Sequence, residues 1–191
     1  LPGHAHAGTL GFELYYQGKP LLADTRTSTY EPGARRSWER STLAHNTVTV
    51  GGMDSSEVWA GFRVARRARV HISGDTSDTL IASHDGYRSR LNVVHTRRWW
   101  IYDDGLEVKD TLSGRGADRF GGMARFIFHP DVAVQATSEQ TLQADDCTFR
   151  FDGARRVFIE TAQISGGFNV LDSTVAVSVS FAGDLTTRIT G

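Results

Sequence analysis

The chain has 191 residues, of which 39% are hydrophobic and 23% are charged, which excludes an intrinsically disordered protein. Its length fits one domain, and a formal net charge of −1 gives no reason to expect a nucleic-acid or membrane-surface partner. Cys147 is the only cysteine, so an internal disulfide is excluded. No apolar run approaches the roughly 20 residues that a membrane span needs.

The extended segments can be taken in chain order, because apolar and polar residues alternate along most of the sequence. Residues 12–16 and 20–23 flank Gln17-Gly18-Lys19, a short hairpin connection that contains glycine. Residues 93–102 and 106–111 flank Asp103-Asp104-Gly105, a strong hairpin signal. The other predicted strands are residues 46–50, 62–72, 79–83, 124–128, 132–136, 148–151, 156–163, 174–181 and 186–190.

No segment shows a helical period of useful length, and the 20 glycines accompany frequent turn signals. The sequence therefore predicts one all-β domain over residues 1–191. We expect a large antiparallel β-sandwich of two sheets, supersandwich-like, with little or no helix. One long segment, residues 25–42, reads as irregular, and loops of that length are usually functional.

Two histidines lie two residues apart in the extended N-terminal segment, so His4 and His6 can face the same site. Asp24 ends an apolar run, and His45 opens the following one. Two imidazoles and a carboxylate are a known donor set for zinc, so His6, Asp24 and His45 could bind it from three successive strands. The alternative is that they are polar strand-end residues with local hydrogen bonds. His4 could then transfer a proton or bind a carboxylate.

The remaining histidines and the basic residues leave alternatives open. His95 lies within an apolar strand, which favours a hydrogen-bonded core histidine, and His84-Asp85-Gly86-Tyr87 favours a turn. Guanidinium groups suit carboxylate and sulfate recognition, but they could equally form a solvated face paired with nearby acids. The arginines that cluster in the sequence are Arg35, Arg36, Arg40, Arg63, Arg66, Arg67 and Arg69.

Six short motifs point in one direction. They are Gly-His-Ala-His-Ala at residues 3–7, Phe-Glu-Leu at 12–14, Gly-Lys-Pro-Leu-Leu-Ala-Asp at 18–24, Arg-Ser-Thr-Leu-Ala-His-Asn-Thr-Val at 40–48, Ser-His-Asp-Gly-Tyr at 83–87 and His-Thr-Arg-Arg at 95–98. Together they resemble the C-terminal β-sheet domain of heparinase II/III-type polysaccharide lyases. The residues beyond these motifs fit that domain only as generic β-structure.

The resemblance implies a bacterial two-domain lyase whose N-terminal α/α toroid is absent from this chain. Such enzymes cleave uronic-acid polysaccharides, heparin/heparan-sulfate-like or alginate-like, by β-elimination. A base removes the C5 proton, an acid protonates the leaving glycosidic oxygen, and an unsaturated uronate results. A tyrosine and an asparagine/histidine pair of the helical domain do much of this work, so this chain alone is expected to be inactive.

The resemblance also implies roles for individual residues. His4 matches an assisting catalytic histidine, and His6, Asp24 and His45 match the ligands of a structural zinc. Tyr30 is the only tyrosine in the loop after Asp24, where some members use one. We assign it to substrate binding together with Arg35, Arg36 and Arg40. Two positions depart from the family pattern: position 8 is glycine where aspartate or asparagine is usual, and residues 25–26 are Thr-Arg where Pro-Gly is usual.

The expected partners are an acidic polysaccharide and the absent helical domain, with a homodimer left open and neither nucleic acid nor membrane expected. The chain starts on its densest motif with neither an initiator methionine nor a signal peptide, so we expect a piece of a longer protein. Periplasm and cytoplasm both fit the cysteine content. Two rival functions remain, a non-catalytic acidic-carbohydrate-binding module that uses tryptophan and arginine, and a cupin-type metal-dependent hydrolase.

Overall fold

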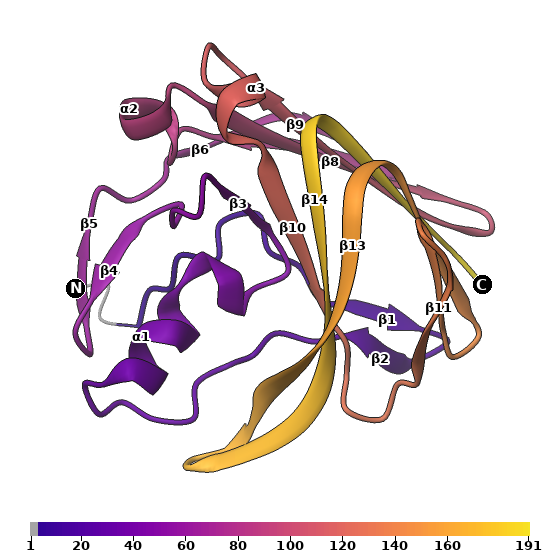
Figure 1. The fold of residues 1–191 in the computed structure, drawn as a ribbon, viewed down its shortest axis with the longest axis horizontal. Helices are drawn as coiled ribbons and strands as arrows, with labels where there is room; N and C mark the ends of the chain where they lie inside the picture. The colour runs from indigo at the N-terminus through magenta and orange to yellow at the C-terminus, as the bar shows by residue number, and fades with distance from the viewer. Residues whose placement is uncertain (1–3) are drawn as a thin grey trace.

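The computed structural model describes residues 4–191 and contains fourteen strands, three short α-helices and one 3₁₀ helix in that range (Figure 1). The strands are β1 (Leu14–Tyr16), β2 (Lys19–Leu22), β3 (Val48–Val50), β4 (Glu57–Trp59), β5 (Arg63–Ala65), β6 (Val70–Asp75), β7 (Thr79–His84), β8 (Val94–Tyr102), β9 (Gly105–Ser113), β10 (Gly122–Ile127), β11 (Val134–Ser138), β12 (Thr141–Ala144), β13 (Cys147–Gly167) and β14 (Val170–Thr190). The helices are α1 (Ala34–Arg40), η1 (Thr42–Ala44), α2 (Arg88–Leu91) and α3 (Ala117–Phe120).

The predicted all-β antiparallel sandwich is confirmed. Ten strands form one large sheet in the order β11-β12-β13-β14-β9-β8-β7-β6, with β10 joining β14 to β3. The hairpins β1–β2 and β4–β5 form separate two-stranded sheets. No helix of the described residues has both the length and the apolar character needed to cross a bilayer.

The hairpin β13–β14 connects β10 and β3 with the strands that begin at β9, because β14 pairs with both β10 and β9. Each strand has 21 residues, where the sequence predicts two shorter strands for each. The first half of β14 pairs with β10, and its second half pairs with β9 from Asp184 onward. The change of partner falls at Gly183, and β13 bulges at Gly153; both have the positive φ that glycine tolerates best. The predicted strand breaks are therefore bends within continuous strands.

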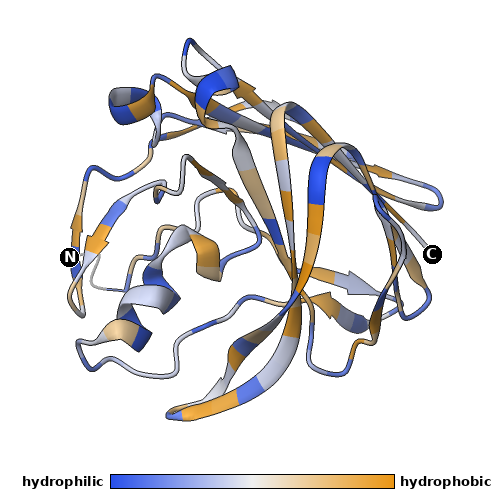
Figure 2. Ribbon diagram, in the orientation of Figure 1, coloured by the Kyte–Doolittle hydropathy of each residue, from blue (hydrophilic) through white to orange (hydrophobic). Residues whose placement is uncertain are grey.

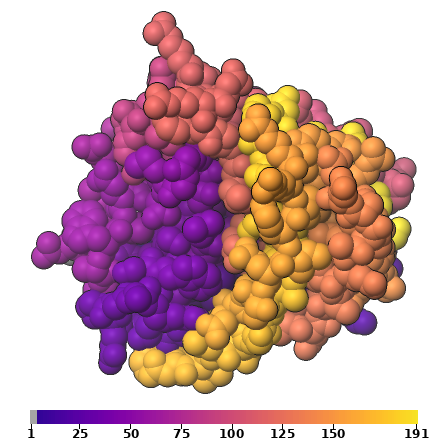
Figure 3. Space-filling model, in the orientation of Figure 1, coloured from indigo at the N-terminus to yellow at the C-terminus, as the bar shows by residue number. Residues whose placement is uncertain are grey.

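Buried aromatic side chains fill the space that this bend encloses. Phe126, Phe128, Phe149 and Phe151 are fully buried, and their rings contact one another edge-on or tilted. Figure 2 shows the apolar residues recurring along β10, β13 and β14, as expected for strands with one face on a core. In Figure 3 the N-terminal part of the chain covers one side of the molecule, and the β13–β14 hairpin passes below it.

The predicted irregular segment, residues 25–42, contains helix α1, which the sequence did not predict. The helix is only seven residues long, and the buried carboxylate of Glu39 connects it to the loop that precedes it. One Glu39 oxygen accepts from the backbone N–H of Ser28 at 3.0 Å and from Arg35 Nε at 2.9 Å. A single buried acid therefore turns the loop back onto the helix, a long-range contact that local periodicity does not record.

A chain of buried polar side chains crosses the large sheet beneath the N-terminal segment. The backbone N–H of Gly86 donates to His84 Nδ1 at 3.2 Å, so His84 Nε2 carries the hydrogen and donates to His95 Nδ1 at 3.1 Å. His95 Nε2 then donates to Asp110 Oδ1 at 2.7 Å, and Arg97 binds both oxygens of that carboxylate at 2.7 and 3.0 Å. His95 is thus the core histidine that the sequence favoured, whereas His84, expected in a turn, is the buried last residue of β7.

The network keeps its histidines neutral and its acid charged. Burial, with help from His95 and Arg97, lowers the pKa of His84 to about 3. Burial alone would raise the pKa of Asp110, but the charge of Arg97 and the bond from His95 outweigh it and lower this pKa to about 2. Arg97 and Asp110 therefore remain an ion pair at every ordinary pH.

These values predict that acid weakens the fold through His84. Between the ordinary imidazole pKa of 6.5 and the folded value of about 3, the unfolded chain binds a proton that the folded chain excludes. The free energy of unfolding should therefore be highest above pH 6.5 and fall on acidification, with a contribution from His84 of about 1.4 kcal/mol per pH unit. The free energy of unfolding, measured with urea at several pH values in this range, should fall less steeply with decreasing pH in His84→Gln than in the wild type. An equal pH dependence in the two proteins would contradict the prediction.

Candidate functional site

The backbone of the N-terminal segment is bound on both sides of His6. Arg40 Nη2 donates to the Ala5 carbonyl at 3.0 Å, and the Ala7 N–H donates to the Arg40 carbonyl at 2.8 Å. The Thr42 hydroxyl donates to the Ala7 carbonyl at 2.8 Å. The end of α1 and the start of η1 therefore fix the segment that carries His4 and His6.

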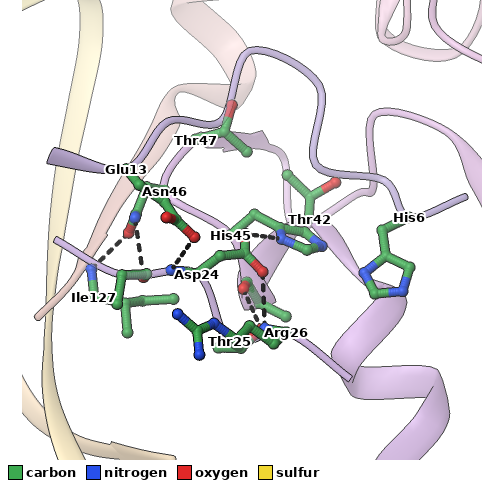
Figure 4. Close-up of polar contacts among 12 residues, drawn as sticks. His6, Glu13, Asp24, Thr25, Arg26, Thr42, His45, Asn46, Thr47 and Ile127 are labelled. Carbon is green, nitrogen blue, oxygen red and sulfur yellow. Dashed lines mark hydrogen bonds and ion pairs between the residues drawn. The ribbon is translucent and has the colours of Figure 1, made fainter. Parts of the chain in front are cut away.

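Asp24 and His45 form the centre of the candidate site (Figure 4). His45 Nδ1 lies 2.6 Å from Asp24 Oδ2, and the His45 ring is almost completely buried where η1 ends. Asp24 follows β2, and its other oxygen accepts the backbone N–H of Arg26 at 2.8 Å. The carboxylate thus orients the imidazole and closes its own turn, and bonds from His45 and Arg26 hold the pKa of Asp24 below its ordinary value although burial opposes them.

Asn46 positions this pair, a role that sequence reasoning missed. Its side-chain oxygen accepts the Ile127 N–H at 2.7 Å, and its amide nitrogen donates to the carbonyls of Phe12 and Ala23 at 2.9 and 3.1 Å. The asparagine therefore joins the segment before β1, the end of β2 and the end of β10. Its place within Ala-His-Asn-Thr-Val was the available signal, but only the fold shows which backbone groups it reaches.

His6 stands beside His45, with 5.2 Å between the ring centroids and no hydrogen bond between them. Its Nε2 lies 3.1 Å from Arg36 Nη1 and 3.3 Å from the Thr27 hydroxyl. Burial, followed by the charges of His45 and Arg36, lowers the pKa of His6 to about 4. A neutral His6 can therefore accept a hydrogen bond from Arg36.

The three predicted zinc ligands are neighbours, but their donor atoms do not converge. Within residues 4–191 no group of three or more His, Cys, Asp or Glu side chains is arranged to hold a metal ion. Asp24 meets Nδ1 of His45, while the buried Nε2 of the same ring has no hydrogen-bond partner. Such an imidazole, oriented by a carboxylate with its second nitrogen open, has the chemistry of a metal ligand whose carboxylate acts from outside the coordination sphere.

Both departures from the family pattern have a physical basis here. A Cβ atom at Gly8 would lie 2.8 Å from Cγ of His45, so the imidazole occupies the space that a side chain at position 8 would need. Arg26 takes a left-handed backbone conformation with φ of 60°, where the family usually has glycine. The bond from its N–H to Asp24 Oδ1 supports that conformation.

Two of the predicted substrate-binding arginines are buried in the structure. Arg36 and Arg40 are fully buried, and Arg40 donates to the carbonyls of Trp59, Ala60 and Arg63 at 3.0 Å each. Both guanidinium groups donate to backbone carbonyls of the β4–β5 hairpin and so hold it against α1. Arg35 is partly exposed and is bound to Glu39 and Gln163.

His4 lies at the surface, next to an aromatic patch whose grouping the sequence did not predict. We define this aromatic patch as Tyr30, Trp59 and Phe62, which are 42%, 45% and 50% exposed. The rings of Tyr30 and Phe62 stack at 6.0 Å, and His4 meets them edge-on at 5.5 and 6.2 Å. Exposed stacked rings beside an imidazole suit contact with a sugar face. Phe62 was missed because its position reads only as strand.

A large apolar hollow in the described part of the chain lies elsewhere. It has a volume of about 860 Å³, is mostly apolar, and separates the β1–β2 hairpin from β6 to β9. Phe12, Trp99 and Ile101 line it, while His6 and His45 do not. The residues of the candidate site therefore lie outside this hollow.

Two comparisons with known proteins give matches, one to solved structures and one to a family model. The chain is similar to the structure of a heparinase III with methylated lysines, with a TM-score of 0.78, 19% identity, and coverage of 98% of this chain and 30% of that one. It is also similar to heparan sulfate lyase HepC from Pedobacter heparinus, with a TM-score of 0.72, 15% identity, and coverage of 98% and 31%. No curated protein matches. The family model described as heparinase II/III-like, C-terminal, matches residues 1–190, and the chain belongs to that family.

Proposed function

We propose that this domain completes the active site of a polysaccharide lyase that cleaves a uronic-acid polysaccharide by β-elimination. The observation that supports this proposal most directly is the exposed His4, which lies beside the aromatic patch in a chain of the heparinase II/III-like C-terminal family. The chain spans about a third of the similar lyases, so the remaining catalytic groups are proposed to come from a helical domain outside it. Two of these lyases are named for heparin and heparan sulfate, which supports an acidic glycan as substrate.

In the proposed reaction, a base removes the C5 proton of the uronate, the C4–oxygen bond breaks, and the leaving glycosidic oxygen receives a proton. The electrons of the C–H bond form the new C4–C5 double bond, so the product is an unsaturated uronate. An imidazole serves such proton transfers because it titrates near neutral pH. His4 is proposed to assist this transfer, while the ring of Tyr30 and the charge of Arg35 contact the substrate.

The test is the substitution His4→Ala in the complete protein that carries this domain. General acid–base assistance contributes about 10²- to 10⁴-fold to a rate, so the turnover number of His4→Ala should be lower than that of the wild type by a factor in that range. The measurement is the rise in ultraviolet absorbance of the conjugated product on heparin, heparan sulfate and alginate.

His71→Ala is the matched control, because His71 is an exposed histidine on β6 outside the site, and its activity should be unchanged. Full activity of His4→Ala would remove His4 from the mechanism. No product absorbance on any uronate polymer with the wild-type protein would count against the lyase proposal itself.

A structural zinc at His6, Asp24 and His45 is a second part of the proposal. Its support is the donor set itself and the buried, unpartnered Nε2 of His45, which is adjacent to His6. If zinc binds, His6 and Nε2 of His45 would hold it, Asp24 would orient the His45 ring through Nδ1, and the metal would stabilise the junction of the N-terminal segment with η1. No catalytic step is assigned to the metal.

Metal analysis of the purified chain should then find one zinc per molecule, and removal by a chelator should lower the melting temperature. His6→Ala should reduce both the zinc content and the effect of the chelator, while His71→Ala should change neither. A structural zinc contributes folding free energy directly. His6→Ala should therefore lower the free energy of unfolding by more than a surface substitution does, which is usually within about 0.5 kcal/mol. Absence of zinc, with the same melting temperature for His6→Ala and wild type, would exclude the metal.

The aromatic patch also favours a second candidate, a non-catalytic module that binds acidic carbohydrate. In that case the chain alone should bind glycan through Phe62 and Trp59, and the complete protein should release no unsaturated product. Binding by the chain combined with cleavage by the complete protein would instead favour the lyase.

A further inference from the structure

A second hollow, lined mainly by charged residues, lies apart from the residues of the candidate site. It has a volume of about 460 Å³ and is formed by the segment between β5 and β6 and the segment after β7. We call it the arginine hollow, after its four arginines Arg66, Arg67, Arg69 and Arg88; Asp85, Gly86 and Ser89 complete its lining. The four arginine side chains are exposed.

Backbone hydrogen bonds hold the two segments of the hollow together. The Arg69 N–H donates to Asp85 Oδ1 at 2.8 Å, and the Asp85 N–H donates to the Arg69 carbonyl at 3.3 Å. The Ala68 N–H donates to the Ser56 hydroxyl at 3.0 Å. Arg66 has a left-handed backbone conformation with φ of 37°, which is unfavourable for a residue other than glycine and persists only where the surrounding structure stabilises it. These hydrogen bonds thus fix the backbone of the segment that carries Arg66, Arg67 and Arg69.

The charges of the hollow are not balanced within it. It holds four guanidinium groups and one carboxylate, although the whole chain has a formal net charge of −1. Arg66 lies 3.5 Å from Glu57, and among the described residues Arg67, Arg69 and Arg88 form no ion pair. Like charges gathered in a concave surface raise the local concentration of anions. Guanidinium groups bind sulfate and carboxylate through paired hydrogen bonds.

The hollow begins one short strand after the aromatic patch along the chain. Phe62 and Arg66 are separated by strand β5, so at most about 13 Å of extended chain lies between them. A glycan that contacts Phe62 could therefore place a later sugar over the hollow. Asp85 could accept a sugar hydroxyl there.

We infer that the arginine hollow binds a sulfate or carboxylate group of an acidic glycan, at a site separate from His4, His6, Asp24 and His45. The anion-binding part follows from the lining of the hollow. The choice of a glycan rests on the proposed function.

The experiment measures binding of a sulfated heparin oligosaccharide to the 191-residue chain by calorimetry. Arg67→Gln/Arg69→Gln should weaken binding about tenfold or more, because two charge-assisted contacts are lost. Arg155→Gln/Arg156→Gln is the matched control, since it removes two exposed arginines from β13, and it should change affinity less than about twofold if attraction by the overall charge is minor. Melting curves of both variants verify that each is folded.

Three further probes decide the ligand. The desulfated oligosaccharide should bind more weakly than the sulfated one, inorganic sulfate should compete at high concentration, and single-stranded DNA of equal charge should bind more weakly than the glycan. Equal losses in the two double variants, or no binding by the wild-type chain, would overturn the proposal, and tighter binding of DNA would overturn the glycan assignment. Binding at the hollow by a protein that shows no lyase activity would leave this inference standing while the proposed function failed.

Discussion

The candidate site depends on one guanidinium buried in the large sheet. Arg97 donates to the carbonyls of Leu10 and Asn46 at 2.9 and 2.7 Å while its other nitrogens bind Asp110. The N-terminal segment and the loop of His45 have no regular pairing with β8, so this side chain supplies the connection that a strand ladder would otherwise give. An ion pair with this burial is tolerated because every charge in it has a partner, and removal of one partner typically costs about 3–5 kcal/mol.

The site is assembled by side chains that bind backbone carbonyls more than by side chains that bind one another. Asn46, Arg40 and Arg97 together reach carbonyl groups of the N-terminal segment, β2 and the β4–β5 hairpin. Irregular backbone cannot satisfy its own polar groups, and buried polar groups without partners are costly. Arginine and asparagine, with several donors each, meet this demand. The same demand explains why arginines expected at a ligand surface lie in the interior.

Two layers of the site can be separated by exposure. His45 is buried and is oriented by the partly exposed Asp24, whereas His4 and the aromatic patch face outward. The inner layer fixes geometry, and the outer layer is available to a glycan or to another domain. The arginine hollow lies on the outer layer beyond β5, so the basic and aromatic parts of this surface are joined by a single short strand.

The sequence by itself determined the fold class, the family and most strand positions, because two-residue periodicity and turn residues are local properties. It also brought Asp24 and His45 together, since both stand at strand ends within recognisable motifs. It missed α1, whose fold depends on the contact between Glu39 and Ser28, and it divided β13 and β14 at glycines that only bend them. Only the tertiary structure placed Arg36 and Arg40 inside and Phe62 beside His4. Burial and pairing between distant segments depend on which surfaces meet in space, and no local pattern of residues carries that information.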